Sequence, residues 1–300
     1  MGNKLTQKEI NKIIENHQHW LKKDVDDWES MKADFFNQDL SDADLSRADL
    51  RNANLRNANL RGANLSGADL SDADLSCANF SRANLSDANL RYADLSYANL
   101  RYANLRYASL CDADIHYANL SDANLCDANL CYANLRHANL RHANLCFVNL
   151  NYAKLCNANL SDAGLRSANL SDANLSNANL SGTKNMMYIP MACPEEGSFI
   201  GFKKAVYADK YYIVKLKIPA DALRSSATSR KCRCNKAKVL EIQNIDGSKA
   251  NIDVVHSTYD SSFQYKTGQI VEEPKFDNNR FNKCSKGIHF FINRQEAVNY

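Results

Sequence analysis

The residue types best suited to metal or thiol chemistry gather in the last third of the sequence. Their spacing does not match a zinc site, because the single residue between two of the cysteines is too short for the usual zinc knuckle. We therefore expect buried structural cysteines, no bound metal and no cofactor. The weak candidate ligands are Cys193, Cys232, Cys234 and Cys284, together with His289 in the apolar run GIHFFI, where we expect a core histidine.

A cluster of cations in the same third has the residue types that bind phosphate. Residues 224–238 contain six cations and no acid, and the candidate phosphate ligands are Arg224, Arg230, Lys231 and Arg233. Arginine holds phosphate through paired, charge-assisted hydrogen bonds. The alternative, which we favour, is a solvated loop, because no glycine-rich phosphate loop is present. No nucleophile arrangement stands out either, so we expect no catalytic residue.

The chain that must position these residues is long enough for two domains. It has 300 residues with 37 basic and 34 acidic side chains, and the net charge is 0 over residues 1–32, −4 over 33–182 and +7 over 183–300. Neither excess by itself indicates a nucleic-acid-binding protein. No apolar run approaches about 18 residues, and the start lacks the features of a secretory signal. We therefore expect a cytoplasmic protein with reduced thiols and no membrane partner.

Half of the chain repeats every five residues. Between residues 33 and 182, every residue whose number is divisible by five from 40 to 180 is Leu, except Phe80 and Ile115. Alanine stands two positions earlier in most units, with Asp or Asn between. Neither a helix nor a strand places residues five apart on one face. A chain that turns a corner every five residues does, and four sides then make a coil of twenty residues. The repeat predicts about 7.5 such coils, stacked about 4.8 Å apart.

Thirty consecutive units of the form Ala, Asp/Asn, Leu, X, X resemble the pentapeptide repeat family. The resemblance implies a right-handed, square-sectioned (quadrilateral) β-helix. We therefore predict a mainly β protein with an N-terminal helical cap over residues 1–32, a β-helix over 33–182 and a small α+β domain over 183–300. In the cap, Thr6 and Glu9 have capping-box spacing at the start of a helix that runs through about Lys23. On its apolar face we expect His17 to be packed and hydrogen-bonded.

Several cysteines fall inside the repeat. Cys111 and Cys131 are twenty residues apart, so the predicted coils bring them together on one side of the stack. Their expected Cα spacing lies within the disulfide range. We nevertheless expect side-by-side reduced thiols that replace serine.

The last segment of the sequence predicts a series of strands followed by one helix. We predict strands over residues 199–207, 211–217, 238–243, 251–256, 269–272 and 288–292, and a helix over 294–300. The segments CPEEGSFIGFKKA, KIPADALRSSATSRKCRC and CSKGIHFF resemble a C-terminal domain that accompanies pentapeptide repeats in some bacterial and phage proteins. This resemblance implies no activity.

Information about a partner can lie only at the Asp/Asn position and at the two X positions that follow each Leu. We expect the Asp/Asn side chains mainly to bond the local backbone at the corners. The second X position is aromatic in two belts around the predicted coils, and arginine precedes three of the tyrosines. Exposed tyrosine and arginine are enriched in interface hot spots. Stacked rings that stiffen the coils are the alternative, and both remain open. The candidate partner-binding residues are Tyr92, Tyr97, Tyr102, Tyr107 and Tyr117 with Arg91, Arg101 and Arg106, then Tyr132, Phe147 and Tyr152, with His137 and His142 completing the second belt.

These features favour a noncatalytic protein–protein interaction scaffold, with the basic C-terminal domain as a second contact surface and a protein of unknown identity as the partner. One alternative is an enzyme or sensor that handles a nucleotide or another phosphate ligand through the C-terminal domain. Another is a DNA mimic that binds a topoisomerase such as gyrase, as some members of the family do. The repeat argues against mimicry, because its net charge is −4 whereas duplex DNA carries one charge per about 1.7 Å.

Overall fold

Two units make up the chain, Met1–Tyr188 and Ile189–Tyr300. The computed structural model describes residues 4–186, 192–226, 228–282 and 285–300. Within these residues, no helix is long and apolar enough to cross a membrane.

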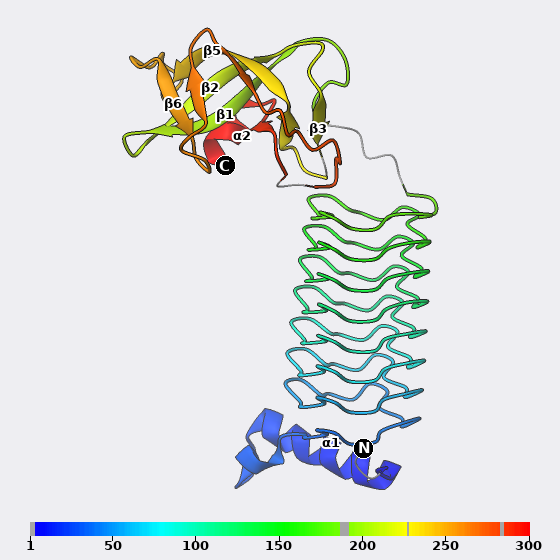
Figure 1. The fold of residues 1–300 in the computed structure, drawn as a ribbon. Helices are drawn as coiled ribbons and strands as arrows, with labels where there is room; N and C mark the ends of the chain where they lie inside the picture. Colours follow the sequence, from blue (N-terminus) through cyan, green and yellow to red (C-terminus); the bar gives the residue numbers. More distant parts are fainter. Residues whose placement is uncertain (1–3, 187–191, 227, 283–284) are drawn as a thin grey trace. The chain divides into compact units, whose positions relative to one another are not determined.

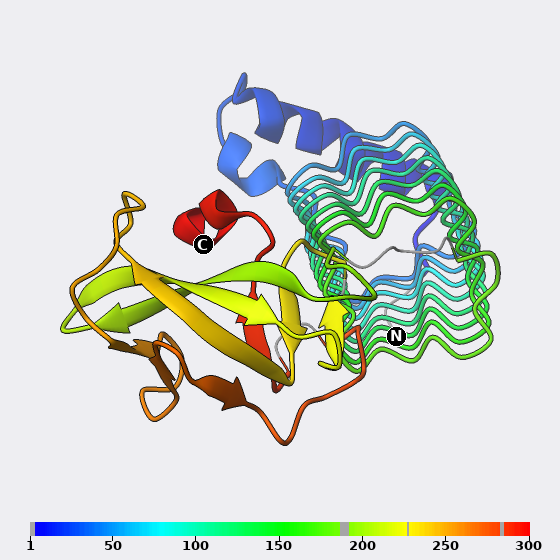
Figure 2. The same cartoon turned by 90° about the horizontal axis from the view of Figure 1, so that it is seen from above.

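The five-residue repeat folds into a stack of coils that we call the rod, residues 33–182 (Figure 1). Parallel bridges join residues twenty positions apart, for example Asp74 with Asp94 and Asn79 with Asn99. Such bridges continue from the first pair, which joins residues 34 and 54, to the last, which joins residues 164 and 184. One coil therefore takes four units, as the sequence predicts. Figure 2 looks along the stack and shows the corners of successive coils lying over one another.

A tight turn at the two X positions makes each corner. In one example, the Ala58 N–H donates to the Leu55 carbonyl oxygen at 3.0 Å, and Asn57 between them has a φ of 59°. A positive φ at the third residue is the signature of a type II turn. The second X residue has a positive φ at every corner from Asn37 to Gly182. Glycine and asparagine tolerate this backbone, whereas bulky side chains rarely adopt it.

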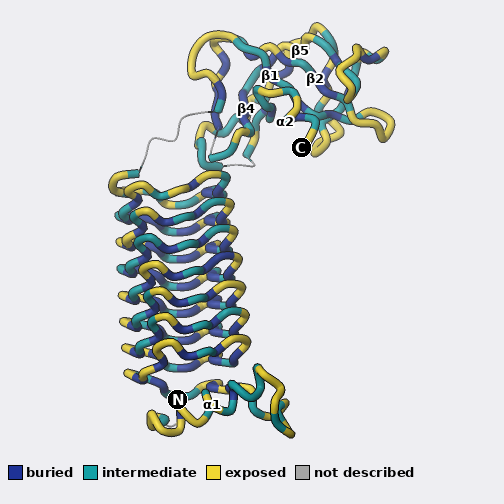
Figure 3. Tube along the Cα trace, turned by 180° about the vertical axis from the view of Figure 1, so that it is seen from behind, coloured by how far each residue is buried: buried dark blue, intermediate teal, exposed yellow. Residues whose placement is uncertain are grey.

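Leucine and alanine fill the interior of the rod. Every Leu of the repeat from Leu40 to Leu175 is buried, as are Phe80 and Ile115, which stand in place of leucine. Buried and exposed segments alternate along the coils (Figure 3). The Asp/Asn position bonds the backbone at the following corner. Asn79 Oδ1, for example, accepts from the N–H of Ser81 at 3.1 Å. The predicted core and the predicted role of this polar position are both confirmed.

A helix and a short 3₁₀ turn cover the first coils. Helix α1 spans Gln7–Lys22 and begins with the predicted capping box, in which the Thr6 hydroxyl accepts from the Glu9 N–H and the Glu9 carboxylate accepts from the Thr6 N–H. The 3₁₀ turn spans Trp28–Met31. The helix lies across the end of the stack (Figure 1).

His17 joins this helix to the rod. Its side chain is fully buried, and its Nδ1 accepts from the Ala33 N–H at 3.1 Å. The second ring nitrogen, Nε2, therefore carries the proton and donates to the Arg51 carbonyl oxygen at 3.0 Å. Burial lowers the pKa of His17 and keeps the ring neutral. The predicted structural role of this histidine is confirmed.

The thiol prediction for the rod is wrong at one pair. Cys111 and Cys131 form a disulfide between adjacent coils, with their Cα atoms 4.8 Å apart. The expected spacing was correct, but two side chains stacked in register at this distance can still rotate toward each other. Cys126 and Cys146, which have the same separation in sequence, are free thiols.

The second unit contains two antiparallel sheets. The larger has the strand order β7-β6-β1-β2-β5-β8 and the smaller the order β3-β4-β9. The larger sheet consists of β1 (Phe199–Tyr207), β2 (Lys210–Ile218), β5 (Lys236–Gln243), β6 (Val254–Ser257), β7 (Gln264–Lys266) and β8 (Ile270–Glu272). The smaller consists of β3 (Arg224–Ser226), β4 (Cys232–Cys234) and β9 (Ile288–Phe290), and helix α2 (Arg294–Asn299) follows.

Two contacts bring the sheets of this unit together. Phe202 on β1 and Phe291 exchange backbone hydrogen bonds of 2.7 and 2.8 Å. Gly201 allows the close approach, because a Cβ atom at that position would lie 2.6 Å from the ring of Phe290. The core of the unit therefore lies between its sheets.

The predicted strands and final helix are present within a few residues of the expected bounds, but β3, β4 and β7 were missed. Two of these strands replace the solvated loop that we favoured for residues 224–238. That interpretation is wrong, because β3 and β4 are buried along their whole length. Their cations satisfy the surrounding backbone and do not face water.

Candidate functional site

The aromatic belts of the rod are exposed. The side chains that the sequence singled out stand on the corners, with 46 to 57% of each surface accessible. All of them occupy the second X position, with φ between 57° and 61°. These are Tyr92, Tyr97, Tyr102, Tyr107, Tyr117, Tyr132, Phe147 and Tyr152.

One corner of the rod carries a ladder of rings. Tyr97 stacks on Tyr117 with ring centroids 5.1 Å apart, and Tyr117 stacks on His137 at 4.6 Å. His116 meets Tyr97 edge-on at 5.2 Å. Stacked pairs stabilise the coils that they join, so the structural alternative fits these residues. Tyr132 and Tyr152 form a similar pair at 4.9 Å on another corner.

Two neighbouring corners carry a different arrangement, which we call the Arg–Tyr clusters. In the first, Arg101 Nη2 donates to the Tyr102 hydroxyl at 2.9 Å and the guanidinium lies 4.7 Å from the ring centre. Arg101 also pairs with Asp122 of the next coil at 3.4 Å.

The second cluster repeats this geometry five residues later. Arg106 Nη2 donates to the Tyr107 hydroxyl at 2.7 Å, the guanidinium lies 4.6 Å from the ring centre, and Asp127 is 3.8 Å from Arg106. Arg91 contacts Tyr92 in the same way, but more loosely, with a hydrogen bond of 3.4 Å. Within the described part of the chain, the tyrosines of the Arg–Tyr clusters do not stack on other aromatic rings, so the ladder does not explain them.

The basic segment of the second unit does not assemble into the predicted phosphate site. Arg224 is buried on β3 and donates to five backbone carbonyl oxygens, those of residues 194, 197, 219, 220 and 222. Arg233 is buried on β4 and donates to the carbonyl oxygens of residues 279 and 282. Arg230 pairs with the carboxylate of Glu296. These contacts give Arg224 and Arg233 a structural role.

The described cysteines of this unit have structural positions in its interior. Cys193, Cys232 and Cys234 are buried. A hydrogen bond between the first two lowers the pKa of Cys193 and raises the pKa of Cys232. Cys284 lies outside the described residues. Among the residues that are described, no group of three or more metal-binding side chains forms.

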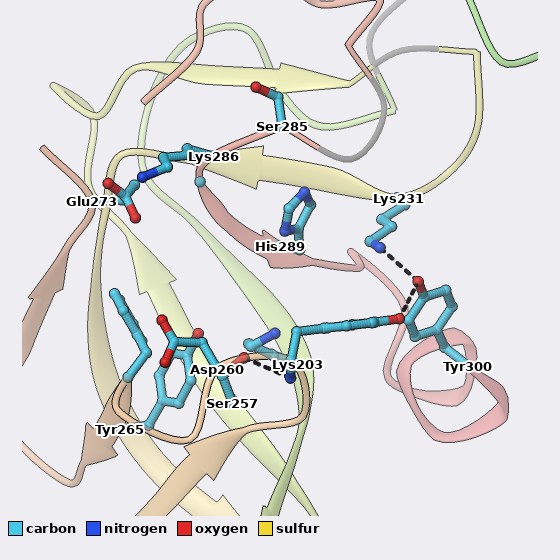
Figure 4. Close-up of a pocket in the computed structure, with 13 residues that line it drawn as sticks. Lys203, Lys231, Ser257, Asp260, Tyr265, Glu273, Ser285, Lys286, His289 and Tyr300 are labelled. Carbon is cyan, nitrogen blue, oxygen red and sulfur yellow. Dashed lines mark hydrogen bonds between the residues drawn. The ribbon is translucent and has the colours of Figure 1, made fainter. Parts of the chain in front are cut away.

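A cavity of about 380 Å³ lies in the second unit (Figure 4). Strands β1, β6, β7 and β9 contribute to its wall, together with the loops that precede β4 and β9. Its charged and polar lining comprises Lys203, Lys231, Ser257, Asp260, Glu273, Ser285, Lys286 and His289, and its aromatic lining comprises Tyr259, Phe263, Tyr265 and Tyr300. The Tyr300 hydroxyl accepts from Lys231 at 2.6 Å and lies 2.9 Å from the Tyr259 hydroxyl.

Lys203 is the most unusual residue of this cavity. It lies on the inner face of β1 with 7% of its surface exposed. Within the described part of the chain it has no hydrogen-bond or ion-pair partner, and its ammonium lies 5.7 Å from the centre of the Tyr265 ring. Burial, assisted by the charge of Lys231, lowers the pKa of Lys203 to about 8.

His289 on β9 shares this environment. Its Nε2 atom is buried and has no hydrogen-bond partner among the described residues. Burial, with the charges of Lys231, Lys203 and Arg233, lowers the pKa of His289 to about 3, so the ring is neutral. The expected core position is therefore correct.

Comparison with protein families identifies the first unit. The model for pentapeptide repeats matches overlapping segments that together span residues 31–182, half of the chain. The chain belongs to the pentapeptide repeat family. Residues 189–297 match a second model, described as a family of unknown function (DUF5758).

Individual relatives match only parts of this pentapeptide repeat protein. Uncharacterized protein L223 of Acanthamoeba polyphaga mimivirus is 40% identical over 96 residues, which is 29% of this chain and 61% of that protein, so the match spans about three fifths of this curated relative. HetL, a pentapeptide repeat protein of the cyanobacterium Nostoc involved in heterocyst differentiation regulation, is 33% identical over 51% of this chain and 83% of its own, with a TM-score of 0.31. QnrB1, a plasmid-mediated fluoroquinolone resistance protein, is 22% identical over 51% and 84% of the two chains, with a TM-score of 0.28.

The cavity in the second unit of this pentapeptide repeat protein was not found from the sequence, although one signal for it exists. The predicted strand at residues 199–207 contains two consecutive lysines, Lys203 and Lys204. Successive residues of a strand point to opposite faces, so one of the two must face the core if the sheet is covered. That face carries Gly201, Lys203 and Ala205, all of which are buried.

Proposed function

We propose that this protein is a noncatalytic scaffold whose rod binds a protein partner. The contact surface is the face between the two corners that carry the Arg–Tyr clusters, at Tyr102 and Tyr107. The observation that carries the proposal is the repetition of one exposed Arg–Tyr–Asp arrangement on neighbouring corners. Tyrosine and arginine are over-represented among the interface residues whose replacement by alanine weakens protein–protein binding most.

The backbone supports a surface role for these tyrosines. Both stand at a positive φ of 61°, where glycine, asparagine or aspartate fits at lower cost, and other corners of the rod use those residues. A bulky residue at such a position needs a compensating interaction. The ladder supplies one at Tyr97 and Tyr117. Among the described residues, Tyr102 and Tyr107 stack on no other ring and contact arginines instead, and Arg82 of the preceding coil lies 6.0 Å from the Tyr102 ring centre. The ring-on-ring ladder therefore does not account for tyrosine at these two corners.

The Arg–Tyr clusters are also held ready for binding. Each tyrosine ring is fixed by a hydrogen bond and a stacked guanidinium, and each guanidinium is positioned by an aspartate of the next coil. Side chains that are already ordered lose less entropy when a partner covers them. Half of each tyrosine surface remains available for contact.

The charge of this face supports a protein partner over DNA mimicry. Arg101 and Arg106 each stand beside one aspartate, so the surface is mixed in sign. A surface that replaces DNA would present a dense row of negative charges. A protein partner with its own mixed charges and an apolar centre fits the Arg–Tyr clusters better.

Quantitative co-purification from the native host tests the proposal. The variant carries Tyr102→Asn and Tyr107→Asn, because asparagine suits the corner backbone. The control carries Asn52→Ser and Asn57→Ser, two corners with the same spacing and φ values of 61° and 59°. We expect a specific protein to be captured by the wild type and by the control at equal levels.

The same protein should be depleted at least tenfold with the tyrosine variant, while the thermal unfolding of all three chains remains similar. Equal capture by the tyrosine variant would overturn the proposal. Similar melting temperatures are needed for this comparison, because they show that the rod is intact in each variant.

A further inference from the structure

The cavity of the second unit contains a charge that the described residues do not neutralise. Lys203 is nine-tenths buried, yet no described carboxylate or carbonyl group contacts its ammonium. A buried lysine without a partner is rare, because desolvation of the ammonium costs free energy that only a counter-charge or hydrogen bonds can offset. A ligand in the cavity can supply that counter-charge.

We propose that the cavity binds a small organic anion with an aromatic body, and that Lys203 pairs with the carboxylate or phosphate group of this ligand. This inference does not depend on the proposed role of the rod. It also differs from the predicted phosphate site, since Arg224 and Arg233 are committed to backbone carbonyl oxygens.

The charged groups around Lys203 indicate that the ligand is negatively charged. Lys231, from the segment before β4, adds positive charge to it. His289, on β9, is neutral, and Tyr265, on β7, is a buried phenol whose pKa is raised by burial. Asp260, in the loop between β6 and β7, accepts hydrogen bonds from the N–H and the hydroxyl of Ser262, and the described residues include no ion pair between Asp260 and Lys203. The region around Lys203 is therefore cationic.

The residues that line the cavity indicate the size and the aromatic character of the ligand. The rings of Tyr259, Phe263 and Tyr265 line the cavity beside Lys203. Figure 4 shows Tyr300 next to Lys231 on one side and Glu273 with Lys286 on the other. A volume of about 380 Å³ suits a ligand the size of a nucleoside monophosphate or an aromatic acid.

Binding should also change the protonation of Lys203. An anion beside the ammonium favours the charged form and raises the pKa of the lysine. Near pH 8.5, where the free protein is partly deprotonated at Lys203, binding should therefore take up protons from the solution. A lysine that serves only the fold would not link proton uptake to ligand.

The experiment is calorimetry of the full chain at pH 7 and pH 8.5 with two series of probes. One contains aromatic carboxylates with benzamide as the neutral counterpart, and the other contains nucleoside monophosphates with adenosine as the neutral counterpart. The test variant is Lys203→Met, which keeps the length of the side chain. The matched control is Lys217→Met, which removes an exposed lysine from β2. Lys231→Met serves as a second cavity variant.

We expect at least one anionic probe to bind more than tenfold tighter than its neutral counterpart, and the tighter series identifies carboxylate or phosphate as the anchor. Lys203→Met should weaken that probe at least tenfold and abolish proton uptake at pH 8.5, whereas Lys217→Met should change neither. Lys231→Met should weaken the probe by a smaller factor. The inference is overturned if no anionic probe binds below about 1 mM, if neutral counterparts bind equally well, or if Lys203→Met leaves affinity and proton uptake unchanged.

Discussion

Replacing Lys203 by methionine should stabilise the second unit at neutral pH. Burial and the charge of Lys231 lower the pKa of Lys203 from 10.5 to about 8. Below pH 8 the ammonium is present in the folded and the unfolded chain, and the folded chain bears the full cost of burying it. A pKa lowered by this amount corresponds to about 3 kcal/mol, as an order of magnitude. Methionine removes the charge and retains most of the packing.

The pH dependence has a definite sign. Between pH 8 and pH 10.5 the unfolded chain binds a proton at Lys203 that the folded chain does not, so the free energy of unfolding rises with pH in this window. The wild type should therefore approach the stability of Lys203→Met as the pH increases to about 10. At pH 7 we expect Lys203→Met to be more stable by about 1 to 3 kcal/mol.

Hydrogen exchange measures the stability of the second unit separately from that of the rod. Amides of β1 and β2 report the opening of the second unit separately from the rod, and their protection is compared for the wild type, Lys203→Met and Lys217→Met at each pH. The difference between variants at one pH removes the intrinsic effect of pH on exchange. If Lys203→Met is no more protected than Lys217→Met at pH 7, the side chain is not an uncompensated buried charge, and the reasoning for the cavity fails at its first step.

Three further predictions concern the rod and its cap. Leu100→Asp places an unpaired carboxylate at a fully buried position and should lower the free energy of unfolding by more than about 4 kcal/mol. If circular dichroism and thermal unfolding showed no change, the inward register of the leucines would be wrong. Tyr117→Asn removes two stacked pairs and should lower the free energy of unfolding by about 1 to 2 kcal/mol, whereas Tyr102→Asn should leave it nearly unchanged. Equal melting temperatures for the two variants would contradict the distinction between the stacked ladder and the Arg–Tyr clusters. His17 has a lowered pKa, so the unfolded chain gains its proton first on acidification, and thermal unfolding should show the first unit losing stability as the pH falls below about 6.5. His17→Gln should flatten that slope, and a wild type equally stable at pH 5 and pH 7.5 would rule out the role of His17 at the cap.

The rod could be predicted from the sequence because its period determines the position of every residue. A five-residue repeat with leucine and alanine fits only a chain that turns at each unit, and the corner, the core and the twenty-residue coil follow from it. The capping box of α1 was equally local, since Thr6 and Glu9 are three residues apart. The disulfide between Cys111 and Cys131 was not decided by position alone, because the same spacing leaves Cys126 and Cys146 as free thiols.

The second unit was harder because its charged residues are buried by distant partners. The strands of Arg224 and Arg233 resemble a solvated loop in sequence, and only the fold brings the backbone carbonyl oxygens that their guanidinium groups require. Serine, arginine and lysine are poor strand signals, which explains why β3 and β4 were missed. Lys203 gives a weaker local signal of its cavity, because the cavity also depends on loop residues near positions 231, 260, 273 and 286.

Site-specific crosslinking tests the proposed protein-binding function of the rod most directly. A photoactivatable phenylalanine analogue replaces Tyr102 in one chain and Asn52, at a corner with the same backbone conformation, in another. After irradiation in the native host, we expect one predominant crosslinked protein from position 102 and none from position 52, and Tyr107→Asn should reduce the yield at position 102. If both positions give the same set of crosslinked proteins, or position 102 gives none, the face between Tyr102 and Tyr107 is not a partner-binding surface.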